Sequence, residues 1–146
     1  MPDFDLKKFD GQKKAQLILG YFNTVAHKYD MMNTLLSFGI HHQWKRTAVR
    51  MMGLNSGDKI LDACGGTGDL AILAARAVGQ TGQATLYDFS SAMINAGRRN
   101  KNNSPIGKRI QYVQGDAQQI SFQDNSFNAA MVGFGIRNVI HMEKAF

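Results

Sequence analysis

A short apolar stretch at residues 59–63 runs directly into a glycine-rich turn, and this junction constrains the fold more than any other part of the chain. The stretch Lys-Ile-Leu-Asp-Ala is followed by Cys-Gly-Gly-Thr-Gly-Asp at 64–69 and by an apolar, helix-like run at 70–75. The pattern predicts a strand, a tight turn and a helix, because glycines let the backbone bend sharply and let a ligand approach closely. The start of that helix would offer unpaired N–H groups to the ligand.

The acid that precedes the glycines indicates which kind of ligand the turn would bind. Asp62 would repel a pyrophosphate, but it would attract the cationic amino or sulfonium end of S-adenosylmethionine. We therefore expect Asp62, Gly65, Gly66 and Gly68 to form part of a cofactor site. Methyl transfer is the leading hypothesis for the function.

Strands and helices alternate along the rest of the chain. We expect strands at 84–88, 109–116 and 127–134, and helices at 70–78 and from the N-cap Ser90 to about residue 100. This alternation predicts an α/β fold, a Rossmann-like parallel sheet with helices on both faces and right-handed crossovers. Apolar residues at helical spacing predict further helices at 12–28 and 41–52, with an apolar cluster at 31–38 between them.

Acidic residues end two more of the predicted strands. Asp88 ends the second strand, and Asp116 ends the third, with Ala117 next to it. Ligands of such sheets bind beyond the carboxyl ends of the strands. Asp88 would accept hydrogen bonds from two ribose hydroxyls, Asp116 would accept one from the adenine amino group, and Ala117 would leave space for the ring.

An NAD-binding oxidoreductase domain is the alternative that these residues leave open. Gly66, Gly68 and Ala71 satisfy the dinucleotide pattern, and Asp88 follows at about the distance where that pattern has a ribose-binding acid. Asp62 and Asp116 count against a dinucleotide, since neither has a role in binding one.

Composition limits the remaining classes. The single cysteine, Cys64, excludes an internal disulfide, and we interpret it as a packing residue rather than a nucleophile. We expect no metal site, because the histidines lack ligand-like partners and the adjacent pair His41 and His42 is typical of a surface. The chain has no apolar run of about 18 residues and no signal-like start, which favours a cytoplasmic location.

The net charge of +6 bears on possible partners. A solvated surface is the default interpretation, and attraction to an anionic membrane surface is the alternative. We expect no nucleic-acid partner, because aromatic residues are not interleaved with the basic ones. The basic residues concerned are Lys45, Arg46, Arg50, Arg98, Arg99, Lys101, Lys108 and Arg109.

Several separate stretches resemble one known family. The stretches are 22–33, 37–41, 44–46, 61–70, 122–127 and 133–139. The glycine turn resembles that of class I S-adenosylmethionine-dependent methyltransferases in general. Lys-Tyr-Asp at 28–30 and Phe-Gly-Ile-Arg-Asn at 134–138 more narrowly resemble the ubiquinone/menaquinone biosynthesis C-methyltransferases.

This resemblance implies residue roles and a substrate. The family's cofactor contacts fall on Thr67, Asp88, Asp116 and Ala117, whereas Gly133 stands where the family has a serine, and Asp116 where relatives often have asparagine. The implied substrate is a polyprenyl quinol. Candidates for catalysis are Arg137 and Asn138, and candidates for closing over the cofactor or substrate are Tyr29 and Asp30.

The resemblance also bears on domain organisation and location. Members of the family continue well beyond the length of this chain, so we expect a fragment with an N-terminal helical lid segment, 1–52, and a partial methyltransferase domain, 53–146. The fourth strand would expose a sheet edge, through which the chain would self-associate. A non-catalytic cofactor-binding or interaction fragment is therefore a further alternative. A polyprenyl substrate would place the protein peripherally at the inner face of the membrane.

Overall fold

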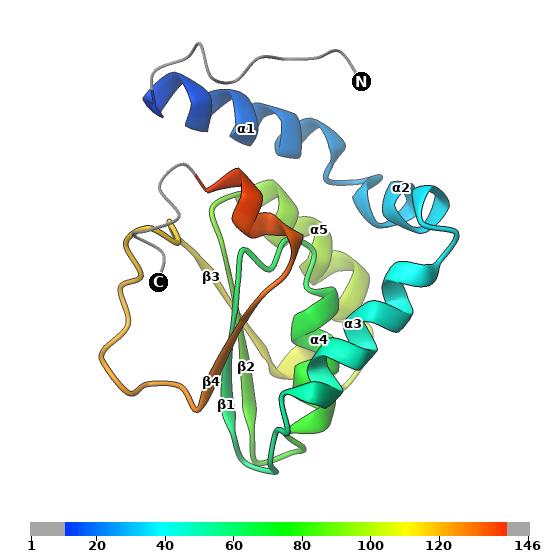
Figure 1. The fold of residues 1–146 in the computed structure, drawn as a ribbon, viewed down its shortest axis with the longest axis vertical. Helices are drawn as coiled ribbons and strands as arrows, with labels where there is room; N and C mark the ends of the chain where they lie inside the picture. The colour runs from blue at the N-terminus through cyan, green and yellow to red at the C-terminus, as the bar shows by residue number, and fades with distance from the viewer. Residues whose placement is uncertain (1–10, 140–146) are drawn as a thin grey trace.

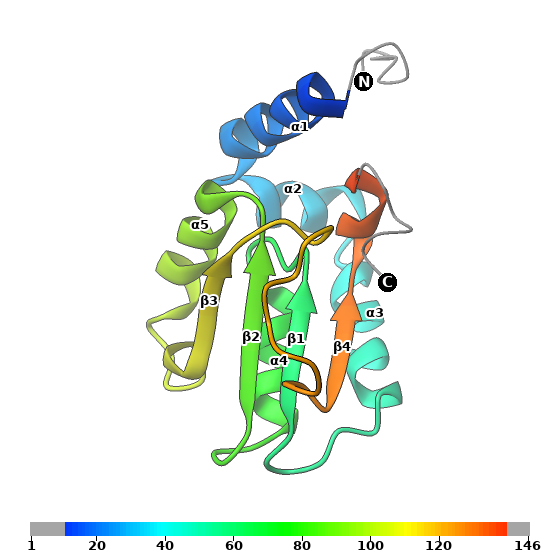
Figure 2. The ribbon, with the colours of Figure 1, turned by 90° about the vertical axis from the view of Figure 1, so that its left-hand side faces the viewer.

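A four-stranded parallel sheet in the order β3-β2-β1-β4 lies at the centre of the computed structural model, which describes residues 11–139 (Figures 1 and 2). In register, Ile60 of β1 lies between Ala84 of β2 and Ala129 of β4. All four carboxyl ends therefore point to the same edge. The strands are β1 Lys59–Ala63, β2 Gln83–Asp88, β3 Ile110–Gln114 and β4 Ala129–Val132.

Five α-helices accompany the sheet within the described residues. They are α1 Gly11–Val25, α2 Tyr29–Leu36, α3 Ile40–Met51, α4 Asp69–Ala77 and α5 Ser91–Lys101, with short 3₁₀ helices η2 Gly107–Arg109 and η3 Phe134–Asn138. Figure 2 shows α3, α4 and α5 behind the sheet, and α1 and α2 beyond the tips of the strands. The N-terminal helices thus cover the edge where the acidic strand ends meet.

The positions of the helices follow from the direction of the crossovers. The chain steps from β1 through α4 to β2 and through α5 to β3, so right-handed crossovers put both helices on one face. It returns to β4 over the opposite face through residues 115–128, where Phe122 lies 5.6 Å from Tyr87 and 4.9 Å from Phe127 between ring centroids. The predicted α/β class is confirmed, although helices α3 to α5 lie on one face and a loop, rather than helices, covers the other within residues 11–139.

Element boundaries differ from the prediction mainly at the ends. The expected helix 12–28 ends at Val25, and α2 begins at Tyr29 after a turn. The expected strand 127–134 is shorter, because residues 134–138 turn into η3. This early turn brings the η3 residues back over the carboxyl ends of the strands (Figure 2).

Small side chains bring helix α4 close to the sheet. Ala71, Ala74 and Ala75 are almost completely buried and face a core that includes Ile60 and Leu86. An alanine-lined helix face approaches a sheet closely while its close packing retains the dispersion contacts. Helix α4 therefore holds the glycine loop, residues 64–68, firmly at the end of β1.

Helix α5 approaches the same loop through a glycine, which gives a test of the fold. A Cβ at Gly97 would lie 2.3 Å from the backbone oxygen of Thr67. We expect Gly97→Ala to lower the free energy of unfolding by about 1–3 kcal/mol, since backbone has to shift to admit the methyl group. Urea denaturation measures this change.

Gly20 supplies the matched control for that substitution. It lies in α1, and apart from its chain neighbours and the backbone of its own helix no heavy atom of the described residues lies within 4 Å of the position that a Cβ would occupy. Gly20→Ala should raise the free energy of unfolding by about 0.5–1 kcal/mol through helix propensity. Equal stability of the two variants would contradict the close contact between α5 and the loop.

Candidate functional site

A cavity of about 780 Å³ lies at the carboxyl edge of the sheet, beneath the N-terminal helices. Its wall includes the ends of β1, β2 and β4, the glycine loop and residues of α1, α2 and α3. Most residues predicted for the site line this cavity. They are Tyr29, Asp62, Gly65, Gly66, Thr67, Asp88, Asp116, Ala117, Gly133 and Asn138.

Three predicted residues stand apart from that set. Gly68 and Asp30 are not part of the cavity wall, although both lie next to residues that are. Gly68 instead precedes α4 as its N-cap, with φ of 85°. The side chain of Arg137 lies outside the described part of the structure, so its predicted catalytic role stays a prediction.

The glycine loop needs its glycines for two different reasons. Gly66 has φ of 57°, a left-handed conformation that glycine adopts without strain. At Gly65, a Cβ would lie 2.8 Å from Leu86 and 2.9 Å from a carboxyl oxygen of Asp62. The absence of a side chain at Gly65 thus lets the loop cross directly over Asp62.

Asp62 is a completely buried carboxyl group in the cavity wall. Neither of its oxygens has a hydrogen-bond partner of normal geometry among the described residues. Burial raises the pKa of Asp62 to about 8, and the Ala71 N–H offsets only part of this rise. A buried acid without a partner is costly, and a cation in the cavity would remove that cost.

Asp88 holds the glycine loop in place from the end of β2. One carboxylate oxygen accepts a 2.8 Å hydrogen bond from the Gly66 N–H, and the other accepts a 2.8 Å bond from the Ser90 N–H. Burial raises the pKa of Asp88, while these backbone bonds act in the opposite direction. The predicted ribose acceptor therefore also joins the loop to the start of α5, a role that the sequence did not indicate.

Asp116 lies at the start of the loop that crosses the second face of the sheet. Its carboxylate accepts a 2.9 Å hydrogen bond from the Gln118 N–H and 3.1 Å bonds from the Gln118 side-chain amide. Ala117 is buried beside it. These bonds fix the carboxylate at the cavity wall, on the β3 side of Asp88.

Cys64 is half-buried at the start of the glycine loop. Burial, together with the nearby Asp88 and Asp62 carboxyl groups, raises the pKa of its thiol to about 12. A thiol with such a pKa stays protonated near neutral pH and is a poor nucleophile. This agrees with the interpretation of Cys64 as a packing residue.

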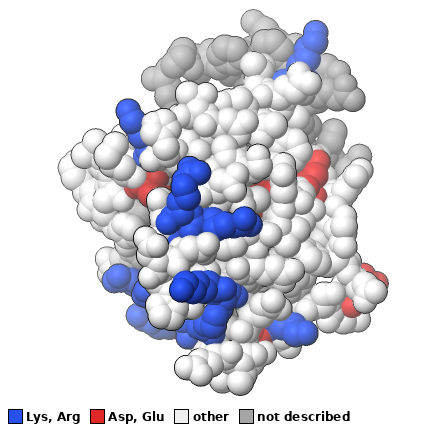
Figure 3. All heavy atoms as spheres, turned by 180° about the vertical axis from the view of Figure 1, so that it is seen from behind, with Lys and Arg blue, Asp and Glu red and all other residues white. Residues whose placement is uncertain are grey.

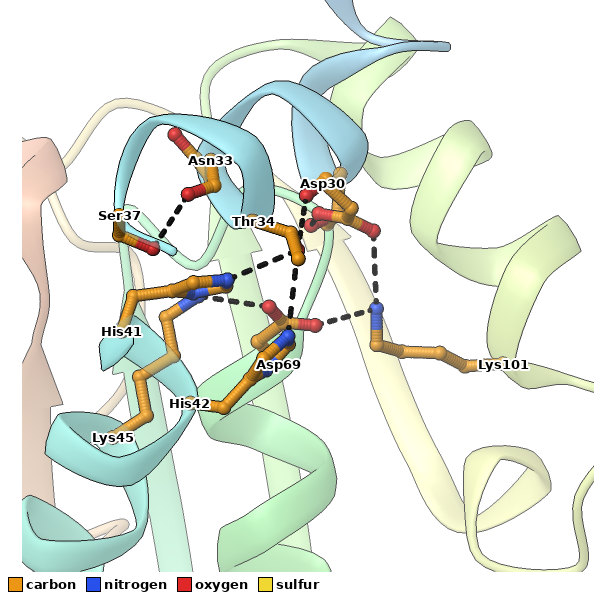
Figure 4. A network of polar contacts seen from close by, with 10 residues as sticks. Asp30, Asn33, Thr34, Ser37, His41, His42, Lys45, Asp69 and Lys101 are labelled. Carbon is orange, nitrogen blue, oxygen red and sulfur yellow. Dashed lines mark hydrogen bonds and ion pairs between the residues drawn. The ribbon is translucent and has the colours of Figure 1, made fainter. Parts of the chain in front are cut away.

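Five side chains join the N-terminal helices to the sheet domain, and we call them the ion-pair cluster (Figure 4). Thr67 donates a short hydrogen bond to Asp30, and Lys101 lies 3.7 Å from Asp30 and 3.0 Å from Asp69. Lys45 lies 2.8 Å from the other oxygen of Asp69. The cluster is Asp30, Lys45, Thr67, Asp69 and Lys101.

Sequence reasoning does not find most of this cluster. The sequence indicates surface charge for Lys45 and Lys101, and it shows Asp69 only as the end of the turn. The two lysines hold the pKa of Asp69 at about 2, well below its usual range, despite partial burial. The preference of acids for the first turn of a helix is the one sequence signal for Asp69.

The expectation of a surface His41–His42 pair is wrong for His41, which is only 4% exposed. Burial against α2 lowers its pKa, with Lys45 and His42 acting in the same direction, and Nε2 lies 3.1 Å from the Thr34 hydroxyl. His41, His42 and Asp69 could together reach one metal ion. Two lysines already balance the charge of Asp69, so we propose no metal there.

Comparison with solved structures identifies the fold class. A SAM-dependent methyltransferase from Aquifex aeolicus superimposes with a TM-score of 0.63 at 20% identity, over 69% of this chain and 53% of that chain. The [4+2]-cyclase SpnF gives 0.64 at 21% identity, over 71% and 38%. Together with the acid-rich cavity, these matches define the class I methyltransferase fold.

Sequence comparison shows the family to which the chain belongs. The model of the ubiE/COQ5 methyltransferase family matches residues 10–146, and the chain belongs to this family. Ubiquinone/menaquinone biosynthesis C-methyltransferase UbiE of Haemophilus ducreyi is 44% identical over 97% of this chain, and that of Shewanella pealeana is 42% identical over 97%. The chain spans 55% and 57% of the length of these two relatives.

The burial of Asp62 predicts an unusual dependence of stability on pH. With its pKa raised from 3.8 to about 8, the folded protein keeps a proton that the unfolded chain releases. Stability from this group is therefore highest below pH 4 and is lost as pH rises towards 8. Asp62→Asn should remove this loss and gain at least about 1 kcal/mol at pH 8.

Urea unfolding of both proteins at pH 5 and pH 8 tests this prediction. The stability difference between Asp62→Asn and the wild type should grow with pH. Asp124→Asn, a change at an exposed acid in the 115–128 loop, serves as the control for the loss of one surface carboxylate. A difference that stays constant with pH would mean that Asp62 is ionised in the folded protein.

Proposed function

We propose that this chain binds S-adenosylmethionine in the cavity at the carboxyl edge of the sheet. The observation that carries the proposal is the fully buried Asp62, which has no hydrogen bond of normal geometry among the described residues and lies beneath a glycine loop that leaves no room for a side chain at Gly65. A dinucleotide would place a pyrophosphate near this acid, whereas S-adenosylmethionine would place a cationic group there. The family and the fold neighbours support the same choice.

The other acids of the cavity wall suit the remaining parts of that cofactor. Asp88 uses one lone pair of each oxygen for backbone N–H groups, which leaves acceptor capacity for ribose hydroxyls. Asp116 would accept from the adenine amino group beside the small Ala117. Gly133 offers no side-chain hydrogen bond where the family has a serine, so the backbone alone lines the cavity there.

We further propose that the protein transfers the methyl group to a ring carbon of a demethylated polyprenyl quinol. The relatives named above are ubiquinone/menaquinone biosynthesis C-methyltransferases, and this supports the substrate class. When bound, the cofactor supplies an activated methyl group. The protein must hold the substrate carbon in line with it and must assist loss of a ring proton.

Arg137 and Asn138 are the candidates for that assistance. Both belong to η3 at the end of β4, and Asn138 lines the cavity. Arginine is a poor base because it stays protonated, so Arg137 would stabilise a phenolate or orient a water that takes the proton. Tyr29, which also lines the cavity, would help to exclude water from the reacting groups.

Calorimetry tests cofactor binding directly. We expect S-adenosylmethionine and S-adenosylhomocysteine to bind and NAD not to bind. Because burial raises the pKa of Asp62 to about 8, a cation beside it should lower that pKa and drive release of a proton. Titrations in buffers of different ionisation enthalpy detect this release, and it should disappear in Asp62→Asn.

Asp88→Ala provides the second arm of the same experiment. It removes the ribose acceptor and the bond to the Gly66 N–H, so binding should be lost. Unchanged affinity would show that the cofactor lies elsewhere. Tight binding of NAD alone would overturn the proposal in favour of an oxidoreductase domain.

We also propose peripheral contact with an anionic membrane surface through the corner between α2 and α3. No helix of residues 11–139 is long and apolar enough to cross a membrane. Phe38 is 92% exposed with φ of 49°, and its apolar neighbours Leu35 and Leu36 are also exposed. Lys28, just before α2, and Arg46, in α3, are exposed. Figure 3 shows that basic side chains gather in the centre and lower half of the face seen from behind.

Co-sedimentation with phospholipid vesicles tests the membrane contact. The chain should bind vesicles containing anionic lipid, and Phe38→Asp should weaken that binding about tenfold. Ile120→Asp, at an exposed apolar residue in the 115–128 loop, should leave it unchanged. Equal effects of the two changes, or dimers in light scattering, would favour self-association instead, for which β4 offers an edge among the described strands.

A further inference from the structure

Lys101 occupies a position that neither the cofactor site nor the fold explains. It is the last residue of α5, its side chain is 13% exposed, and it is not part of the cavity wall. Its aliphatic stem passes within 3.8 Å of the Cβ position of Gly68, and its Nζ lies between Asp30 and Asp69. A lysine at a helix end normally extends into water, so this inward course is informative.

The contacts of Lys101 connect three separate segments. Asp69 begins α4, Asp30 belongs to α2, and Thr67 of the glycine loop donates a hydrogen bond to Asp30. Figure 4 shows Lys101 reaching both acids from the side opposite Lys45 and the histidines. Lys101 thereby holds the lid helix α2 against the loop that forms the floor of the cavity.

The contact between α2 and the glycine loop depends on Lys101, because its positive charge balances those of the two acids. Asp69 keeps a second partner, Lys45, if Lys101 is neutralised. Asp30 has no other ion pair among the described residues, so it would then face the Asp69 carboxylate with only the Thr67 hydrogen bond to stabilise its charge. Like charges at this range repel, and partial burial weakens screening by water. Loss of Lys101 should therefore separate α2 from the loop while the sheet domain stays intact.

Separation of α2 from the loop would open the cavity. Tyr29, the first residue of α2 and the neighbour of Asp30, lines the cavity together with Gly66 and Thr67. We propose that Lys101 is a positioning residue that keeps the lid closed over a bound cofactor, and thereby sets how fast the cofactor leaves. This inference rests on the proposed function.

Stopped-flow binding of S-adenosylhomocysteine tests the inference, with the single tryptophan, Trp44, in the cavity wall as the fluorescent probe. Lys101→Met should raise the dissociation rate about tenfold with little change in the association rate, as expected when one partner of a partly buried ion pair is removed. Salt should speed dissociation from the wild type and have little effect on the variant. Lys108→Met is the matched control, because Lys108 is exposed on η2 and has no ion pair with a described residue.

A double-variant cycle separates positioning from a general loss of structure. Asp30→Asn breaks the same contact from the other side, so its effect and that of Lys101→Met on the dissociation rate should not add. Full additivity, or a dissociation rate for Lys101→Met equal to that of Lys108→Met, would overturn the inference. If Lys101→Met does not fold, Asp30→Asn alone decides, and a dissociation rate equal to that of the wild type refutes the closed lid.

The same experiment keeps the two proposals apart. No binding of S-adenosylhomocysteine by the wild type would refute the proposed function. Binding by the wild type with identical kinetics in Lys101→Met and Asp30→Asn would refute only the role of Lys101.

Discussion

The glycine loop lies close to both β2 and α5 because Gly65 and Gly97 carry no side chains, and the geometry of the cavity depends on this close approach. Gly65 lies over Asp62 and Leu86, and Gly97 lies against the Thr67 backbone. Asp88 then fixes the loop by bonds to the Gly66 and Ser90 N–H groups. Once the loop is fixed, the end of β1 and the start of α4 have defined positions, and so has the floor of the cavity.

This arrangement produces two kinds of acidic residue, one that is paired with lysines and one that has no cationic partner. Asp69 has two lysine partners, and its pKa is lowered to about 2, so it remains ionised and supports the structure. Asp62 has neither a cationic partner nor a hydrogen bond of normal geometry among the described residues, and its pKa is raised. Groups with strongly raised pKa values in a cavity are typical of functional sites, whereas paired ones are often structural. The contrast supports the proposed ligand-binding role of Asp62 and a scaffolding role for Asp69.

The strand ends are predictable from sequence because an acid stands at the end of each of three strand-like runs or within two residues of it. Asp62, Asp88 and Asp116 therefore have to meet at one edge of a parallel sheet. The ion-pair cluster is not predictable, since its lysines and acids are far apart along the chain and only the packing of α2, α3 and α5 brings them together. The polar sequence neighbours of His41 indicate a surface position, but α2 covers that side of α3. The distribution of helices over the two faces depends on strand order, which helical periodicity does not encode.

The contact between Gly133 and Leu70 has a consequence for how this sequence can vary. A Cβ at position 133 would lie 3.1 Å from a Leu70 methyl group, so a side chain there requires that methyl to give way by a few tenths of an ångström. Gly133 follows β4 and Leu70 belongs to α4, and a side chain at position 133 would compete with the Leu70 side chain for the same space at the cavity wall. Acquiring the family's serine at position 133 would be coupled to the size and rotamer of residue 70, and the two positions should covary among relatives.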